Sequence, residues 1–132
     1  MRKKLTYFLL IVFLASIFSG CKKNVHEANP DFIGDWKSCG TCFSFISIRE
    51  NSSGSWVEAG QSEECDGANI SGTFRLGKDK LKLKTYTFKV IEYPTWFDSL
   101  NTGCGKLYNT WKMQLKDPKI WGGEVNRYYK QQ

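Results

Sequence analysis

The segment LYNTWKMQLK, residues 107–116, decides the fold class. Successive side chains of a β-strand point to opposite faces, so a strand with one buried face alternates apolar and polar residues. One set of alternating positions here is apolar except at Asn109 and holds Leu107, Trp111, Met113 and Leu115. The other set is mainly polar and holds Tyr108, Thr110, Lys112, Gln114 and Lys116. The segment therefore predicts a half-buried antiparallel strand.

Short β-rich runs lie before and after this strand, and turn residues separate them. We expect strands at residues 33–38, 41–49, 55–59, 69–76, 81–90, 107–116 and 124–130, with Ile120 and Trp121 in a further short run. No segment after the first twenty residues has the 3.6-residue apolar period of a helix. Many short strands with turns between them are typical of a barrel or sandwich. We predict an all-β fold, a small antiparallel barrel of about eight strands.

One of these runs changes its alternating pattern. Its apolar residues occupy odd positions up to Leu83 and even positions from Tyr86. One flat strand cannot bury both sets on the same side, because a shift of one residue reverses the faces. We therefore predict a bulge or tight turn near Lys84 and Thr85.

Length and composition limit the class of protein. The chain has 132 residues, of which 41% are hydrophobic and 15% aromatic, enough for one packed domain and too apolar for a disordered chain. A single histidine, His26, excludes most Ser-His-Asp and Cys-His mechanisms, and the carboxylates are scattered over turns. Glu63, Glu64 and Asp66 lack the regular spacing of a calcium loop. We predict no enzyme, no cofactor and no metal site.

The first twenty residues have the pattern of a secretory signal. Arg2, Lys3 and Lys4 precede an apolar run from Leu5 to Phe18, and two small residues follow. The run has fourteen residues, whereas a permanent membrane helix needs about 20. Removing the three basic residues of the signal lowers the net charge from +6 to +3, so nucleic acid is not an expected partner.

Residues 17–21, IFSGC, resemble the lipobox of bacterial lipoproteins. That resemblance implies that the Cys21 thiol receives a diacylglycerol and that Cys21 becomes the new N-terminus. Two or three acyl chains are enough for stable membrane anchoring. Lys22 and Lys23 occupy the positions where aspartate retains many such proteins in the inner membrane, so the resemblance favours a protein of the cell envelope, at the outer membrane and facing the periplasm. We expect a signal peptide over residues 1–20, a flexible tether over residues 21–31 and the barrel domain over residues 32–132.

Four cysteines remain after Cys21. An even number in a small exported domain predicts two structural disulfides among Cys39, Cys42, Cys65 and Cys104, with three possible pairings. The C-x-x-C spacing of Cys39 and Cys42 also permits a thiol–disulfide redox site, although a strand follows it where thioredoxin-like proteins have a helix. Zinc is the third alternative, but no second close pair of ligands is present.

A second resemblance concerns the fold. The segment FIGDW, residues 32–36, resembles the G-x-W motif that opens the first strand of lipocalins and related calycin barrels. In that family the tryptophan closes the barrel base and a basic residue of the last strand packs over it. The resemblance implies this role for Trp36 and Arg127, which would form a cation–π pair. The chain is also similar to small lipoproteins of Bacteroidota that have a lipocalin-like barrel.

Two surface features are candidate binding sites. Trp96 and Phe97 fall in the predicted irregular connection from Pro94 to Gly105, where they either bind a sugar or an apolar ligand or plug one end of the barrel. A basic stripe could contact anionic head groups, or its lysines could simply protect a strand from aggregation. It consists of Lys80, Lys82 and Lys84.

The functional expectation is a lipid-anchored, non-enzymatic envelope protein that contacts the membrane through its anchor. It would bind an envelope protein or a small apolar ligand. The alternative is a periplasmic thiol–disulfide protein that uses Cys39 and Cys42. An empty barrel interior would favour a ligand carrier, and a filled interior would favour a packed scaffold.

Overall fold

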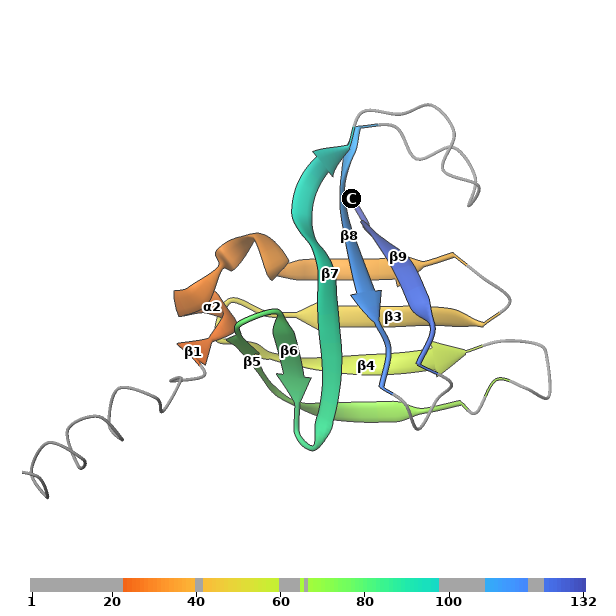
Figure 1. Ribbon diagram of the computed structural model, residues 1–132, viewed down its shortest axis with the longest axis horizontal. Coiled ribbons are helices and arrows are strands. Elements are labelled where there is room, and N and C mark those ends of the chain that lie inside the picture. The colour runs from red at the N-terminus through yellow and green to blue at the C-terminus, as the bar shows by residue number, and fades with distance from the viewer. Residues whose placement is uncertain (1–22, 40–41, 60–64, 66, 98–108, 119–122) are drawn as a thin grey trace, which may run out of the picture.

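The computed structural model describes residues 23–39, 42–59, 65, 67–97, 109–118 and 123–132. It is an all-β barrel with little helix, which confirms the predicted fold class (Figure 1). The expected signal peptide, Cys21, Cys104, Leu107, Tyr108 and the run at Ile120 lie outside the described residues. The elements are β1 (Lys23–Asn24), α2 (Val25–Ala28), the 3₁₀ turn η1 (Pro30–Phe32), β2 (Gly34–Ser38), β3 (Phe43–Ile48), β4 (Ser53–Ala59), β5 (Asn69–Gly77), β6 (Lys80–Leu83), β7 (Tyr86–Phe97), β8 (Thr110–Lys116) and β9 (Val125–Lys130).

Eight of these strands, β2 to β9, close into one antiparallel barrel. Each strand pairs with the next along the chain, and β9 returns to pair with β2. The closing pair joins Trp36 to Lys130. Closure leaves no exposed edge among these strands, which removes the usual template for edge-to-edge association. The ninth strand, β1, pairs with the end of β5.

Tight turns place the hairpins where the sequence predicts them. The β5–β6 and β6–β7 turns hold Asp79 at φ 52° and Lys84 at φ 54°, the left-handed values that short hairpin turns need. The turn at Lys84 and Thr85 confirms the predicted break in alternation. It lets Leu83 of β6 and Phe88 of β7 both face the interior.

The interior is occupied by large side chains. Trp56 packs edge-on against Phe88 with ring centroids 5.0 Å apart. Burying each side chain of this size contributes roughly 1.5–3 kcal/mol to stability. Eleven large side chains of this core are less than 2% exposed: Trp36, Trp56, Tyr128, Phe32, Phe74, Phe88, Ile46, Ile48, Leu81, Leu83 and Met113. Tyr129 is also buried, but it lies opposite Lys37 and Lys112 on the outer face of the sheet.

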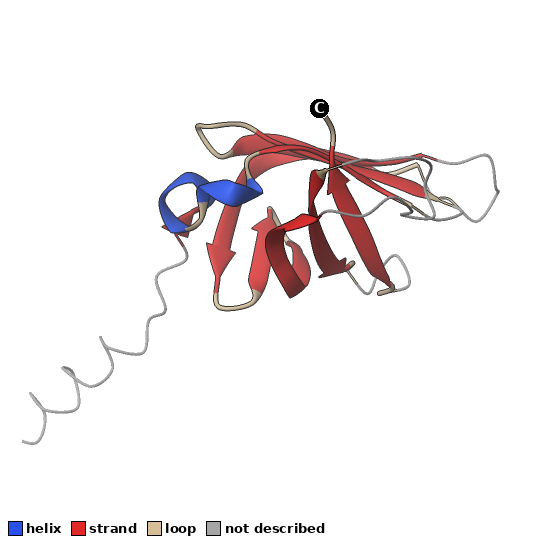
Figure 2. Ribbon diagram, turned by 90° about the horizontal axis from the view of Figure 1, so that it is seen from above, coloured by secondary structure: helices blue, strands red, loops and turns tan. Residues whose placement is uncertain are grey.

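The segment before the barrel is folded, and the predicted tether is wrong for residues 23–31. Val25 of α2 is fully buried in the core cluster, and the His26 backbone N–H donates to Ser52 Oγ at 3.0 Å. Asn29 caps η1, because its Oδ1 accepts from the Asp31 N–H at 3.0 Å. The segment lies at one end of strands β2 to β5 (Figures 1 and 2). Its single buried valine gives no periodic pattern, so the sequence does not reveal it.

Candidate functional site

Trp96 and Phe97 are strand residues, so the predicted irregular connection is wrong for residues 94–97. Its remaining residues, 98–105, lie outside the described residues. Trp96 and Phe97 both belong to β7, opposite Trp111 and Thr110 of β8. Pro94 lies at a shift of register in the β7–β8 pairing, between the partners of Glu92 and Thr95. A strand tolerates proline at such a bulge because the ladder hydrogen bonds are already interrupted there.

Trp96 lies on the inward side of this strand near its end. It is 58% exposed and packs edge-on against Trp111, with ring centroids 6.2 Å apart. It therefore does not plug the barrel. Phe97 points the other way, against Tyr129 at 6.0 Å between ring centroids. The two predicted ligand residues thus lie on opposite faces of the sheet.

The basic residue over Trp36 is Lys130, and the assignment of this role to Arg127 is wrong. Lys130 Nζ lies 5.4 Å from the Trp36 ring centroid and 5.8 Å from that of Trp111. Arg127 is exposed and pairs with Gln114. In the β2–β9 pairing, Trp36 lies opposite Lys130 at the end of β9. Lys130, three residues after Arg127, therefore takes the role.

The glycine of the G-x-W segment makes room for this lysine. Gly34 has φ 138°, and a Cβ built on it would collide with Lys130 Cε. The Trp36 indole N–H donates to the Phe32 carbonyl at 2.8 Å, which fixes the ring. Partial burial lowers the pKa of Lys130, and the nearby carboxylate of Asp31 opposes that change.

An aromatic–lysine band crosses the outside of the barrel. We define the band as Phe43, Phe45, Lys37, Tyr129, Lys112 and Phe97. Its central members are directly opposed in the register, from Lys112 through Tyr129 and Lys37 to Phe45. Directly opposed residues project from the same face of a sheet. Aromatic rings and ammonium groups therefore alternate across strands β8, β9, β2 and β3.

Lysine ammonium groups lie over the rings of the band. Lys37 Nζ is 5.0 Å from the Phe43 centroid and 5.6 Å from the Phe45 centroid. Lys112 Nζ is 4.8 Å from the Phe97 centroid and 3.2 Å from Glu92 Oε1. Lys37 has no carboxylate within ion-pair distance among the residues that the structure describes.

The accessible part of the band lies on β3. Phe43 is 42% exposed and Phe45 39% exposed. Their neighbours in the strand, Ser44 and Ile46, point inward and are buried. The sequence does not predict this orientation, because apolar residues occupy both faces of FSFISI at residues 43–48. The unusual feature of this segment is Ser44, a small polar residue between two phenylalanines, which is buried while both phenylalanines are exposed.

A polar cluster lies inside the barrel near the end of β8. Asp117 accepts from the Tyr128 hydroxyl at 3.0 Å and from Asn126 Nδ2 at 2.7 Å. Burial raises the pKa of Asp117 from 3.8 to about 6, and the two hydrogen bonds limit the rise. Burial, followed by the Asp117 charge, raises the pKa of Tyr128 well above its usual value. The cluster is a satisfied network of buried groups rather than an open site.

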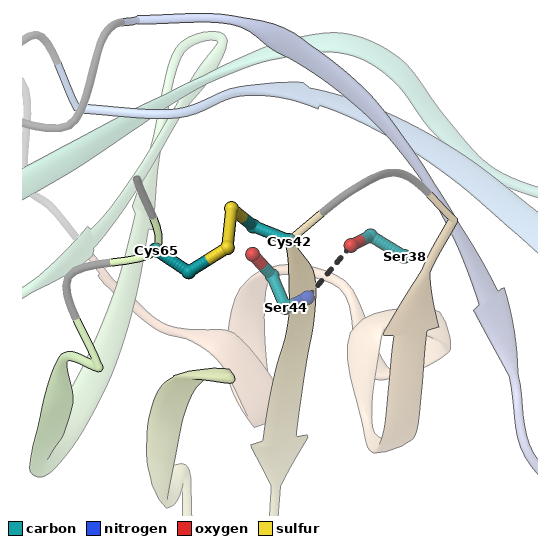
Figure 3. Close-up of a disulfide and its surroundings, with 4 residues drawn as sticks. All are labelled: Ser38, Cys42, Ser44 and Cys65. Carbon is teal, nitrogen blue, oxygen red and sulfur yellow. Dashed lines mark hydrogen bonds between the residues drawn. A yellow bond between two sulfur atoms is a disulfide. The ribbon is translucent and has the colours of Figure 1, made fainter. Parts of the chain in front are cut away.

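The sulfur atoms form disulfides rather than a free dithiol. Cys42 is bonded to Cys65, with an S–S distance of 2.08 Å and Cα atoms 5.6 Å apart (Figure 3). Cys39 is also disulfide-bonded. Cys104, the fourth member of the predicted set, lies outside the described residues. Beside the bridge, the Ser44 backbone N–H donates to Ser38 Oγ at 2.8 Å, which ties together the ends of β2 and β3 (Figure 3).

Neither a metal cluster nor a membrane-spanning helix is found in the described ranges. No group of three or more His, Cys, Asp or Glu residues there could hold a metal ion. No helix there has the length and apolar character needed to cross a bilayer. Comparisons with protein families, with curated proteins and with solved structures found no match.

Proposed function

We propose that the chain is a lipid-anchored, non-enzymatic protein of the cell envelope that binds a protein partner through the aromatic–lysine band. The observation that carries the proposal is the pair of exposed phenylalanines, Phe43 and Phe45, beneath the ammonium group of Lys37. Contiguous exposed apolar groups on a soluble surface mark interaction sites, since isolated ones are common but clusters are not. The proposed location is the outer membrane facing the periplasm, with the anchor on Cys21.

The chemistry of the band favours a polypeptide partner that carries both apolar and acidic side chains. The two phenylalanine rings offer apolar area on a rigid strand. Lys37 lies above them and has no carboxylate partner within the described ranges. Aromatic residues are enriched in protein interfaces, and complementary charges across an interface fix its register.

The filled interior supports surface binding over transport of an apolar ligand inside the barrel. Trp36, Trp56 and Phe88 occupy the centre that a carrier would leave open. The disulfide arrangement supports a structural role for the cysteines. An oxidised C-x-x-C redox site has its two cysteines bonded to each other, whereas Cys42 is bonded to Cys65.

Site-specific photo-crosslinking in living cells tests this function. A photoreactive amino acid replaces Phe45 in one variant and Ile91 in the other. The two side chains are 39% and 47% exposed, and they lie on opposite walls of the barrel. We expect a discrete protein adduct from position 45 and none from position 91.

A second substitution in the band sharpens this test. Changing Phe43→Ser in the variant that carries the photoreactive group at position 45 should reduce the adduct several-fold without altering the amount of folded protein. An adduct of equal intensity from positions 45 and 91, or no adduct from position 45, would contradict the assignment of the band.

A further inference from the structure

The outer wall formed by strands β5 to β8 carries a concentration of cationic side chains. We define this basic face as Arg75, Lys80, Lys82, Lys89 and Lys116. Lys80 of β6 lies directly opposite Lys89 of β7, which lies directly opposite Lys116 of β8. Arg75 of β5 lies directly opposite Lys82. Two rows of like charge therefore run across neighbouring strands.

An anion against the row formed by Lys80, Lys89 and Lys116 would relieve the repulsion between these like charges. Neighbouring strands are about 4.8 Å apart, and like charges directly opposite each other destabilise a sheet. Lys80, Lys89 and Lys116 are exposed, and no carboxylate of the described part of the chain lies within ion-pair distance of them. The nearest turn contains Asp79, whose carboxylate accepts a hydrogen bond from the Tyr93 hydroxyl at 3.2 Å.

The basic face adjoins the point where the chain would leave the membrane. Lys23 and Asn24 of β1 pair with Leu76 and Arg75 of β5, so the sheet begins two residues after Cys21. Two residues of extended chain span only about 7 Å. This is less than the screening length of about 8 Å at physiological salt, so charges near β1 act on the head groups of the same bilayer.

A pocket between β1 and the β5–β6 turn extends the basic face toward the anchor. Its volume is about 380 Å³, and its lining includes Lys23, Lys78, Glu27 and Tyr93. Two lysines and one carboxylate leave a net positive lining. Phosphate oxygens of a lipid head group match such a lining in charge and in hydrogen bonding.

We propose that the basic face binds the anionic lipid head groups of the membrane that holds the anchor. The inference rests on the proposed anchoring at Cys21. It also fixes the orientation of the barrel: β6 is four strands from β2 in either direction around the closed sheet, so β2 and β6 are on opposite walls. With β6 against the bilayer, Lys37 and the exposed phenylalanines of β3 face away from it and stay open to a partner.

Amine footprinting of the mature, lipidated protein in vesicles tests the inference. The protein is reconstituted in phosphatidylcholine alone or with phosphatidylglycerol added, labelled with a water-soluble acetylating reagent and digested for mass spectrometry. We expect acetylation of Lys80, Lys89 and Lys116 to fall several-fold in the anionic vesicles and to recover at high salt. Lys37 should be acetylated equally in both vesicles, which makes it an internal control.

A matched pair of variants tests the row itself. Lys89→Gln removes the central charge of the basic face, and Lys37→Gln removes one charge from the opposite wall. Lys89→Gln should restore much of the acetylation of Lys80 and Lys116 in anionic vesicles, and Lys37→Gln should leave their protection unchanged.

The outcomes separate this inference from the function on which it rests. Protein that floats with the vesicles but shows equal acetylation of the three lysines in both lipids overturns the membrane-facing assignment and leaves the anchor intact. Equal protection in neutral vesicles also overturns it, because anionic lipid is then not the cause. Protein that does not float with the vesicles overturns the anchor and the inference together.

Discussion

Lys130 is the basic residue that packs at the base of the barrel. Its ammonium group lies between the rings of Trp36 and Trp111, where Arg127 was expected. Gly34 leaves the space that its side chain fills. A cation held over an aromatic ring contributes roughly 0.5–2 kcal/mol. The base of the barrel therefore depends on the last residue of β9.

Lys130→Met tests this pair, because methionine keeps a similar apolar stem and loses the charge. We expect the free energy of unfolding, measured by urea denaturation, to fall by about 1 kcal/mol. Arg127→Met is the matched control on the same strand, and its effect should stay within about 0.5 kcal/mol. A larger loss from Arg127→Met than from Lys130→Met would return the role to Arg127.

Asp117 makes stability depend on pH in an unusual direction. Its folded pKa of about 6 lies above the value of 3.8 for a free side chain, so the folded protein binds this proton more tightly than the unfolded chain does. The stabilisation is complete below pH 3.8 and is lost as pH rises to about 6. A difference of about two pKa units corresponds to roughly 3 kcal/mol.

Asp117→Asn isolates this contribution, since asparagine cannot ionise. We expect the difference in unfolding free energy between the variant and the natural chain to shift in favour of the variant as pH rises through this window. Thermal or urea unfolding at a series of pH values provides the measurement. A difference that does not vary with pH would show that Asp117 has the same pKa in the folded and unfolded chain.

At the scale of elements, the segment formed by β1, α2 and η1 joins the barrel to the expected anchor. It contributes Val25 and Phe32 to the core and a hydrogen bond to Ser52. With the proposed anchor at Cys21, a sheet that begins at Lys23 would leave almost no free chain between lipid and barrel. The barrel would then be restricted in orientation, which a long tether would not achieve.

Val25→Ala tests whether the segment is part of the fold. Removing two buried methyl groups should lower the unfolding free energy by about 1–3 kcal/mol in urea denaturation. Glu27→Ala is exposed in the same helix and serves as the control, with little expected change. If both substitutions have equal and negligible effects on the unfolding free energy, the segment is a flexible tether and not part of the fold.

The sequence predicts the elements better than it predicts their faces. Alternation in residues 107–116 and the change of pattern at Lys84 locate strands and a turn, because local sterics and one-sided burial determine them. Strands with apolar residues on both faces are ambiguous, so neither the exposure of Phe45 nor the role of Lys130 follows from sequence. Pro94 suggests the end of a strand, whereas the bulge in β7 accommodates it.

At the scale of the whole molecule, the closed barrel separates two surfaces. The basic face occupies the wall around β6, and the exposed part of the aromatic–lysine band occupies the wall around β2 and β3. A filled core holds both walls at a fixed distance and orientation. In the proposed arrangement one wall contacts lipid and the other contacts protein, and the short link to Cys21 decides which wall is which.

The mass of the N-terminal peptide from protein extracted out of the native membrane tests the central claim most directly. The account predicts a peptide that begins at Cys21 and carries the mass of a diacylglycerol. A peptide that still contains residues 1–20, or an N-terminal Cys21 without lipid, would contradict it, since nothing would then hold the basic face against a bilayer.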